Sequence, residues 1–157
     1  MWYMKPVTVT LDVPYPREQV FDFLDVMSNH EPFTNHMLHD WEYSGPDRGI
    51  GSKAKVTVKA AGRSETVEME VVTAERPRSI VEQNVSANGR RVGTGTYTLD
   101  ELPGGHTRIA FEYAWRTAPL SERMAAPLVR AILRRGNERA MTRLAEQLAQ
   151  HETAPVN

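Results

Sequence analysis

Histidine is the residue type in this chain with the clearest capacity for acid–base or metal chemistry, and three of the five histidines fall in one short segment. His30, His36 and His39 lie within the stretch SNHEPFTNHMLHDW. His36 and His39 have the spacing of two ligands on one helical face. His30 fits neither helical nor strand spacing to them, and Pro32 interrupts a common helix. We therefore expect no metal site and no cofactor.

Two interpretations of the histidine segment remain. In the first, these side chains belong to the surface or to a lid and make ordinary hydrogen bonds. In the second, His36 or His39 faces the mouth of a cavity as a proton donor or acceptor, because imidazole has an unperturbed pKa near neutrality.

Length and composition indicate one domain. The sequence has 157 residues, of which 40% are hydrophobic, enough for a substantial core. We expect this single domain over residues 1–150 and a frayed tail over residues 151–157. Because the chain has no cysteine, disulfides, thiolate metal ligands and a cysteine nucleophile are excluded.

Charge and hydropathy argue against two classes of partner. Lys and Arg number 19 against 20 Asp and Glu, so the net charge of -1 predicts no contact with nucleic acid. No apolar run approaches the roughly 18 residues of a membrane-spanning helix. The N-terminal segment lacks the order of a signal peptide. We expect a cytoplasmic protein without membrane insertion, and the oligomeric state stays open.

The elements that must position any site are visible in the hydrophobic pattern. Residues 7–13 alternate apolar and polar side chains, which is typical of a strand with one buried face. Residues 17–27 carry apolar side chains at helical spacing after Pro16. From about residue 50 to Trp115, alternating segments separated by turns predict antiparallel strands, and Asn88 with Gly89 is a strong hairpin signal.

A long amphipathic helix is predicted over about residues 120–149. Its apolar side chains recur every four residues, from Met124 through Leu128 and Ile132 to Leu148. Pro127 either kinks this helix or lies near its true start. Strands followed by a closing helix predict an α+β fold, with a curved antiparallel sheet of about seven strands wrapped round the C-terminal helix.

Four segments of the sequence resemble the START-like superfamily, also called SRPBCC or Bet v 1-like, and within it the polyketide cyclase/dehydrase group. They are VPYPREQVFDFLDVMSNHEPF, GPDRGIGSKAKV, GTYTLDELPGGHTRIAFEY and RAMTRLAEQL, which together span nearly the whole chain. The resemblance implies a helix-grip fold with an apolar cavity between sheet and helix. It also implies binding of lipids, steroids, polyketides or plant hormones, and cyclisation or dehydration in a minority of members. Where many members carry a tryptophan after the first helix, this chain has Phe33 inside a histidine-rich version of the segment, so a more polar lid is expected.

Strand alternation indicates which side chains line such a cavity. Gln83 shares its face with Val81 and Val85, while Arg91 shares its face with Tyr97. For the aromatic residues, the competing interpretation is ordinary packing in the core. For Arg91, the competing interpretation is a side chain near a strand end whose charged group reaches water. The residues predicted to contact a ligand are Phe33, Gln83, Gly93, Gly95, Tyr97, Tyr113, Trp115, Leu128, Ile132 and Gly136.

Glycines on inward faces suggest empty space. Gly93 and Gly95 lie within a predicted strand, where glycine packs nothing, so a ligand is expected to fill the volume above them. Gly136 on the long helix either leaves similar space or lets helix and sheet approach closely.

The sequence favours binding of a small, largely apolar molecule in the cavity. The alternative is an enzyme resembling polyketide cyclases or dehydratases, in which the cavity folds a reactive chain and a polar side chain moves a proton. Its candidate catalytic residues are Tyr97, Tyr113, Arg91, His36 and His39. A third alternative is a module that binds a protein partner and no ligand.

Overall fold

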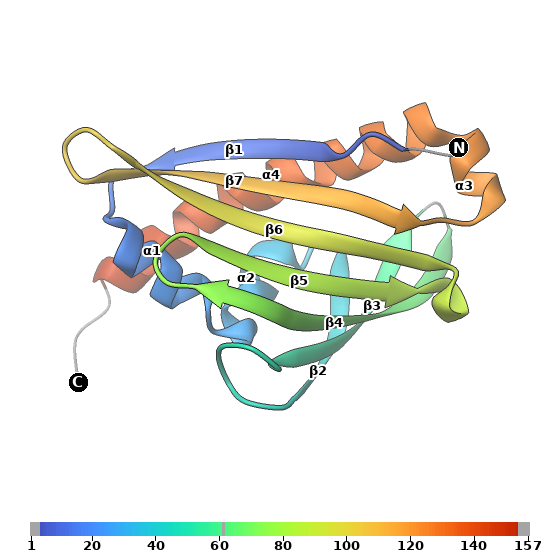
Figure 1. The fold of residues 1–157 in the computed structure, drawn as a ribbon, viewed down its shortest axis with the longest axis horizontal. Helices are drawn as coiled ribbons and strands as arrows, with labels where there is room; N and C mark the ends of the chain where they lie inside the picture. The colour runs from blue at the N-terminus through green and yellow to red at the C-terminus, as the bar shows by residue number, and fades with distance from the viewer. Residues whose placement is uncertain (1–3, 61, 154–157) are drawn as a thin grey trace.

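Seven strands form one antiparallel sheet in the order β1-β7-β6-β5-β4-β3-β2 (Figure 1). The structure is a computed structural model that describes residues 4–60 and 62–153. The strands are β1 (Val7–Val13), β2 (Leu38–Ser44), β3 (Lys53–Ala60), β4 (Arg63–Glu75), β5 (Ser79–Ser86), β6 (Arg91–Leu102) and β7 (His106–Thr117). The helices are α1 (Arg17–Leu24), α2 (Glu31–Thr34), α3 (Leu120–Met124) and α4 (Ala126–Thr153), with short 3-10 turns η1 (Met27–His30) and η2 (Ala87–Gly89).

This arrangement confirms the predicted α+β helix-grip fold. In Figure 1, α2 and α4 lie behind the sheet, α4 runs diagonally behind β1 and β7, and α3 lies beyond the end of β7. The face of the sheet toward the helices is called the inner face below, and the opposite face is called the outer face.

The C-terminal helical segment differs from the continuous helix predicted over residues 120–149. It is divided at Ala125, which leaves the helical region with φ -103° and ψ 25°. Pro127 falls in the first turn of α4, where its missing N–H costs no hydrogen bond. Proline therefore marks the start of α4, one of the two placements that the sequence allowed. α4 continues to Thr153, and residues 154–157 of the predicted frayed tail lie outside the described residues.

The second half of α4 is packed into the core. Ala140, Met141, Leu144 and Leu148 are buried in the same cluster as Phe21, Leu24 and other apolar residues of α1 and the strands. These side chains lie on one side of the helix at helical spacing, as expected for an amphipathic helix.

The first half of α4 is held to the edge of the sheet by polar contacts. The Arg130 guanidinium donates hydrogen bonds to the carbonyls of Lys5 and Pro6, at 2.9 and 3.0 Å. Arg134 donates to the Thr8 carbonyl at 3.2 Å. These contacts place α4 beside β1.

Leu128 and Ile132 lie on the apolar repeat that predicted burial, but both side chains are exposed. With 3.6 residues per turn, each lies about 160° round the helix from the arginine that contacts β1. Leu128 is 62% exposed and Ile132 is 52% exposed. The four-residue apolar repeat drifts round a 3.6-residue helix, so its two halves cannot share one buried face.

Truncating one leucine in each half of α4 tests this difference in packing. Leu144 is 0% exposed, so Leu144→Ala should lower the free energy of unfolding by about 2–5 kcal/mol. Leu128→Ala is the matched control and should change it by no more than about 0.5 kcal/mol. Urea unfolding followed by circular dichroism measures both values. Equal losses for the two variants would contradict the described packing of α4.

Candidate ligand site on the inner face of the sheet

Strand β5 presents a polar row to the interior. Its buried side chains are Ile80, Glu82, Asn84 and Ser86, while the residues between them are only partly buried. This corrects the prediction for Gln83, which lies on the outer face. The prediction assumed that the apolar Val81 and Val85 face inward together with Gln83, whereas the alternate residues of β5 are the buried ones.

Glu82 is a carboxyl group inside the protein, with 6% of its surface exposed. Burial raises the pKa of Glu82 to about 7, because the charged form loses its hydration. A hydrogen bond from the Asn84 side chain opposes this rise. Glu82 therefore changes its protonation state near neutral pH.

Asn84 completes the polar part of this row. It is 9% exposed, and its Oδ1 atom is buried without a hydrogen-bond partner. Since the Asn84 amide group donates to Glu82, the free atom is an acceptor. A buried acceptor without a partner carries a desolvation cost that a suitable ligand would remove.

Neighbouring strands bring the predicted glycines beside these groups. Glu82 pairs with Gly95, and Gly95 pairs with Tyr113. Asn84 pairs with Gly93. Directly paired residues share a face, so the predicted residues of β6 and β7 do lie on the inner face.

The space above the glycines is occupied by protein, which corrects the prediction that it is empty. A Cβ atom on Gly93 would collide with the ring and hydroxyl of Tyr113. A Cβ atom on Gly95 would lie 3.0 Å from Glu82 Oε1 and 3.0 Å from the Phe111 ring. These glycines make room for side chains of the adjacent strands.

Gly136 also permits a close approach. A Cβ atom at this position would collide with Met37 Sδ, so the glycine lets the segment before β2 lie against α4. The sequence left open either empty space or a close approach of helix and sheet; the structure shows a close approach, but to the segment before β2.

Aromatic side chains of β6 and β7 continue the inner face beside the polar row of β5. The two sets together are called the inner row. The rings of Tyr97 and Phe111 are 4.6 Å apart between centroids, and those of Tyr113 and Trp115 are 5.0 Å apart. Burial raises the pKa of Tyr113 to about 12, and burial together with Glu82 raises that of Tyr97. Both hydroxyls therefore keep their protons and can donate hydrogen bonds at neutral pH. Trp115 remains partly exposed at the end of the sheet nearest α3.

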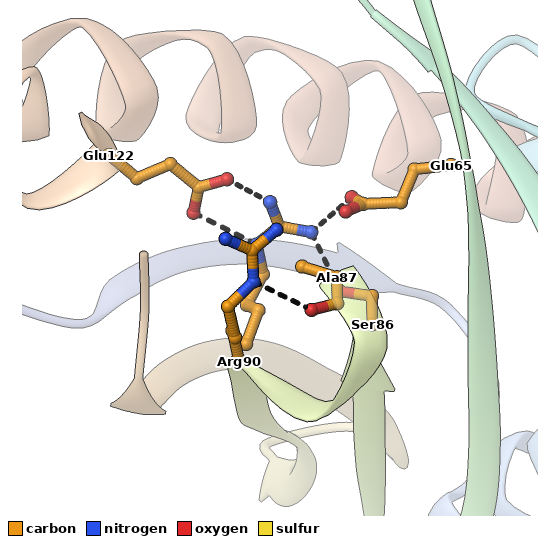
Figure 2. Close-up of polar contacts among 6 residues, drawn as sticks. Glu65, Ser86, Ala87, Arg90 and Glu122 are labelled. Atoms are coloured by element: carbon orange, nitrogen blue, oxygen red, sulfur yellow. Dashed lines mark hydrogen bonds and ion pairs between the residues drawn. The ribbon is translucent and has the colours of Figure 1, made fainter. Parts of the chain in front are cut away.

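At that end, Arg91 ties three elements together, and Figure 2 labels its partners Glu65, Ser86 and Glu122. Its guanidinium forms ion pairs with Glu65 of β4 and Glu122 of α3, and donates a hydrogen bond of 2.7 Å to Ser86 Oγ. Its Nε atom lies 2.9 Å from Glu122 Oε2. These partners occupy the guanidinium, so Arg91 acts in the structure as the link that holds α3 to the sheet.

The three clustered histidines are placed in different environments. His30 is buried, donates from Nε2 to the Leu24 carbonyl at 2.7 Å, and has its ring 5.6 Å from that of Tyr97. Burial lowers the pKa of His30. Phe33, which is 1% exposed, packs beside it in the core.

The remaining two histidines lie away from the polar row of β5. His36 donates from Nε2 to the Gly136 carbonyl at 2.9 Å, and its Nδ1 atom is 3.3 Å from Arg143. Burial lowers the pKa of His36, which favours the neutral ring in this contact. His39 pairs with Thr57, next to the inward-facing pair Leu38 and Val58. Because successive strand residues point to opposite faces, His39 lies on the outer face.

Within residues 4–60 and 62–153, no group of three or more His, Cys, Asp or Glu side chains is arranged to hold a metal ion. In the same part of the chain, no helix is both long enough and apolar enough to cross a membrane.

A separate hollow of about 530 Å³ lies over the outer face of β2 to β5. Its lining includes Glu42, Lys53, Glu68 and Gln83. Lys53 and Glu70 form an ion pair of 3.6 Å within it. Such a charged lining suits water and ions better than an apolar molecule, whose sites are mostly apolar.

Glu82 and Asn84 were not among the predicted site residues, although the sequence contains a signal for them. The hairpin between β5 and β6 pairs Ser86 with Arg91. Arg91 was correctly predicted to face inward, so pairing across a short hairpin places Ser86, Asn84 and Glu82 inward as well. Hairpin length was therefore a better guide to this strand than its apolar residues.

Comparisons with known proteins support the fold. The solved structure of TTHA0849 from Thermus thermophilus superposes with a TM-score of 0.73 at 17% identity, over 95% of this chain and 100% of that chain. The Zhui aromatase/cyclase from Streptomyces sp. R1128 gives a TM-score of 0.73 at 15% identity, over 97% and 98%. Ara h 8.0201 gives 0.67 at 13% identity, over 94% and 99%. These similarities show a shared fold.

No curated protein matches the chain in sequence. A family model described as "Polyketide cyclase / dehydrase and lipid transport" matches residues 4–149. This match covers nearly the whole sequence and agrees with the helix-grip fold and with the resemblance noted in the sequence. The chain therefore belongs to the polyketide cyclase / dehydrase and lipid transport family.

Proposed function

We propose that this protein binds a small, largely apolar molecule between the inner face of the sheet and α4. The observation that carries the proposal is the incomplete cover of this apolar interior near α3. Leu128 and Ile132 are 62% and 52% exposed, and Tyr113 and Trp115 of the inner row are only partly buried. Leaving large apolar side chains in water forgoes the free energy of burying them, which a bound apolar molecule would recover.

The composition of the inner face supports the same proposal. Small-molecule sites combine apolar and aromatic walls with a few polar groups that orient the ligand. Here the walls include Met69, Val71 and Phe111, and the polar groups are Glu82 and Asn84. Fold and family are consistent with binding of a hydrophobic ligand in this region.

A second candidate function is catalysis similar to that of polyketide cyclases or dehydratases. The specific observation in its favour is Glu82, whose pKa of about 7 suits a group that both accepts and donates protons at neutral pH. In such a reaction the Glu82 carboxylate would remove a proton from a carbon beside a carbonyl group. The Tyr113 hydroxyl would donate a hydrogen bond to the enolate oxygen. Arg91, His36 and His39 have less part in this scheme, because the first two are held by other partners and the third lies on the outer face.

Side-chain amide signals can test the site of binding directly. We expect the neutral apolar fluorophore N-phenyl-1-naphthylamine to bind saturably, with a rise in its fluorescence. In the ¹H-¹⁵N spectrum of labelled protein, it should shift the Asn84 side-chain amide, because that group lies on the inner face. The side-chain amide of Gln83 on the outer face is the internal control and should not move.

Two outcomes would refute this proposal. One is a shift of the Gln83 amide without a shift of Asn84, which would place the probe in the outer hollow. The other is no saturable binding of the probe.

The buried carboxyl also predicts how stability depends on pH. Because the pKa of Glu82 rises from 4.5 to about 7 on folding, the folded state holds this proton more tightly than the unfolded state. Its contribution therefore becomes unfavourable as pH rises from about 4.5 to 7, reaching on the order of 3 kcal/mol above that range. Glu82→Gln should stabilise the protein at pH 8 relative to its effect at pH 5.

Urea unfolding of both proteins at a series of pH values measures this difference. Glu68→Gln removes an exposed carboxylate from the neighbouring strand and should not reproduce the pH-dependent gain. A Glu82→Gln difference that is constant from pH 5 to pH 8 would show that Glu82 titrates alike in both states.

A further inference from the structure

More carboxyl groups than cations act on the Tyr113 hydroxyl, and the inference drawn from this rests on the proposed function. The charges that act on the Tyr113 hydroxyl come from Arg91, Glu82 and Glu65. Arg91 is additionally paired with Glu122. Among the charges that act on this hydroxyl, Arg91 is thus the cation, and its guanidinium is shared by Glu65 and Glu122.

Glu82 has no cationic partner among the described residues. The group that acts favourably on its charged form is the neutral amide of Asn84. Arg91 is already bound by Glu65, Ser86 and Glu122, with its side chain 19% exposed. An ionised carboxylate in an apolar interior is costly unless a cation pairs with it.

Asn84 provides an independent observation on the same row. Its Oδ1 atom is buried and has no partner, and it is a hydrogen-bond acceptor. Glu82 in its ionised form is also an acceptor. The two neighbouring side chains therefore offer acceptors for a group that is not part of the described chain.

We propose that Glu82 and Asn84 form a subsite for the protonated amine of an apolar ligand. An ammonium group carries three N–H donors, so it can reach both the carboxylate and the amide oxygen at once. It also neutralises the buried charge, which a neutral hydroxyl does not. A ligand carboxylate would meet the acceptor oxygen of Asn84 and, once Glu82 is ionised, a negative charge.

The register shows how the rest of such a ligand would lie. Glu82 pairs with Gly95, and Ser86, four residues along β5, pairs with Arg91. Four residues of antiparallel strand span roughly 13–14 Å. An apolar chain anchored at Glu82 would pass Tyr113 and Trp115 and end near the incompletely covered side of α4. An aromatic ring near the ammonium group would add to the attraction.

The groups around Glu82 define how binding should depend on pH. The charge of Glu82 acts on two titratable side chains, Tyr97 of β6 and Tyr113 of β7, and both have raised pKa values. His30 of η1 lies beyond Tyr97 and has a lowered pKa. The buried side chains of α4 are apolar or amide groups and do not titrate in this range. Ionisation of Glu82 near pH 7 should therefore dominate the pH dependence of amine binding.

Three compounds of equal chain length test the subsite: decylamine, decanol and decanoate. Each is titrated against protein that holds N-phenyl-1-naphthylamine, and loss of fluorescence measures displacement. At pH 8, decylamine should displace the probe at a concentration about tenfold or more below that of decanol, as expected for a hydrogen-bonded ion pair. At pH 5.5 this preference should largely disappear, because Glu82 is protonated while the amine keeps its charge.

Variants assign the preference to Glu82. Glu82→Gln keeps the shape of the side chain and should abolish the preference for decylamine over decanol. Glu68→Gln, on the outer face, should retain the preference. The pH dependence in the unmodified protein needs no variant, so it tests the subsite even where Glu82→Gln folds poorly.

The outcomes separate this inference from the proposed function. Displacement by decanol without a preference for decylamine, or a preference that survives in Glu82→Gln, would overturn the amine subsite and leave apolar binding intact. Equal or stronger displacement by decanoate would overturn it as well. If neither the probe nor any of the three compounds binds, both proposals are wrong.

Discussion

The position of α4 is the constraint on which the interior of this protein depends. Its second half is fixed by burial of Leu144 and Leu148, and its first half is fixed by arginine contacts to backbone carbonyls of β1 and the preceding residues. Burial of the second half of α4 excludes water from that end of the interior. The arginine contacts of the first half leave the Leu128 and Ile132 side of the helix exposed. Packing at one end and edge contact at the other therefore give an interior that is closed near α1 and less covered near α3.

Glu82 shows that stability alone does not explain the inner face. A carboxyl group in this environment opposes folding at neutral pH, and an apolar residue of similar size would remove that cost. Natural proteins often accept such local costs at sites that serve binding or catalysis. The apolar core around Leu24, Leu99 and Ile109 offsets the cost, since these side chains are almost completely buried.

Local sequence patterns predicted the fold well, because alternation and helical spacing report directly on which face of an element is buried. These patterns were less informative for an element that carries apolar residues on both of its faces, because the pattern then does not show which face is buried. Along β5, Val81 and Val85 suggested the wrong inner face for Gln83, and only the hairpin to Arg91 carried the correct register. Along α4, the four-residue repeat suggested burial of Leu128, but the rotation of the helix places it nearly opposite the Arg130 side that contacts the residues before β1. Both errors concern tertiary placement, which local periodicity does not specify.

The inward glycines of β6 and the polar row of β5 are two parts of one arrangement. Gly95 lies between Glu82 and the Phe111 ring, and Gly93 lies under Tyr113. A side chain at either glycine would displace these groups, because close-packed interiors accommodate added atoms only by shifting their neighbours. The glycines therefore act on the site indirectly: they contribute no contact of their own, and they allow the carboxyl of Glu82 and the hydroxyl of Tyr113 to lie over the same part of the inner face. Strand glycines next to inward polar residues are thus informative about the position of those residues, and not only about empty volume.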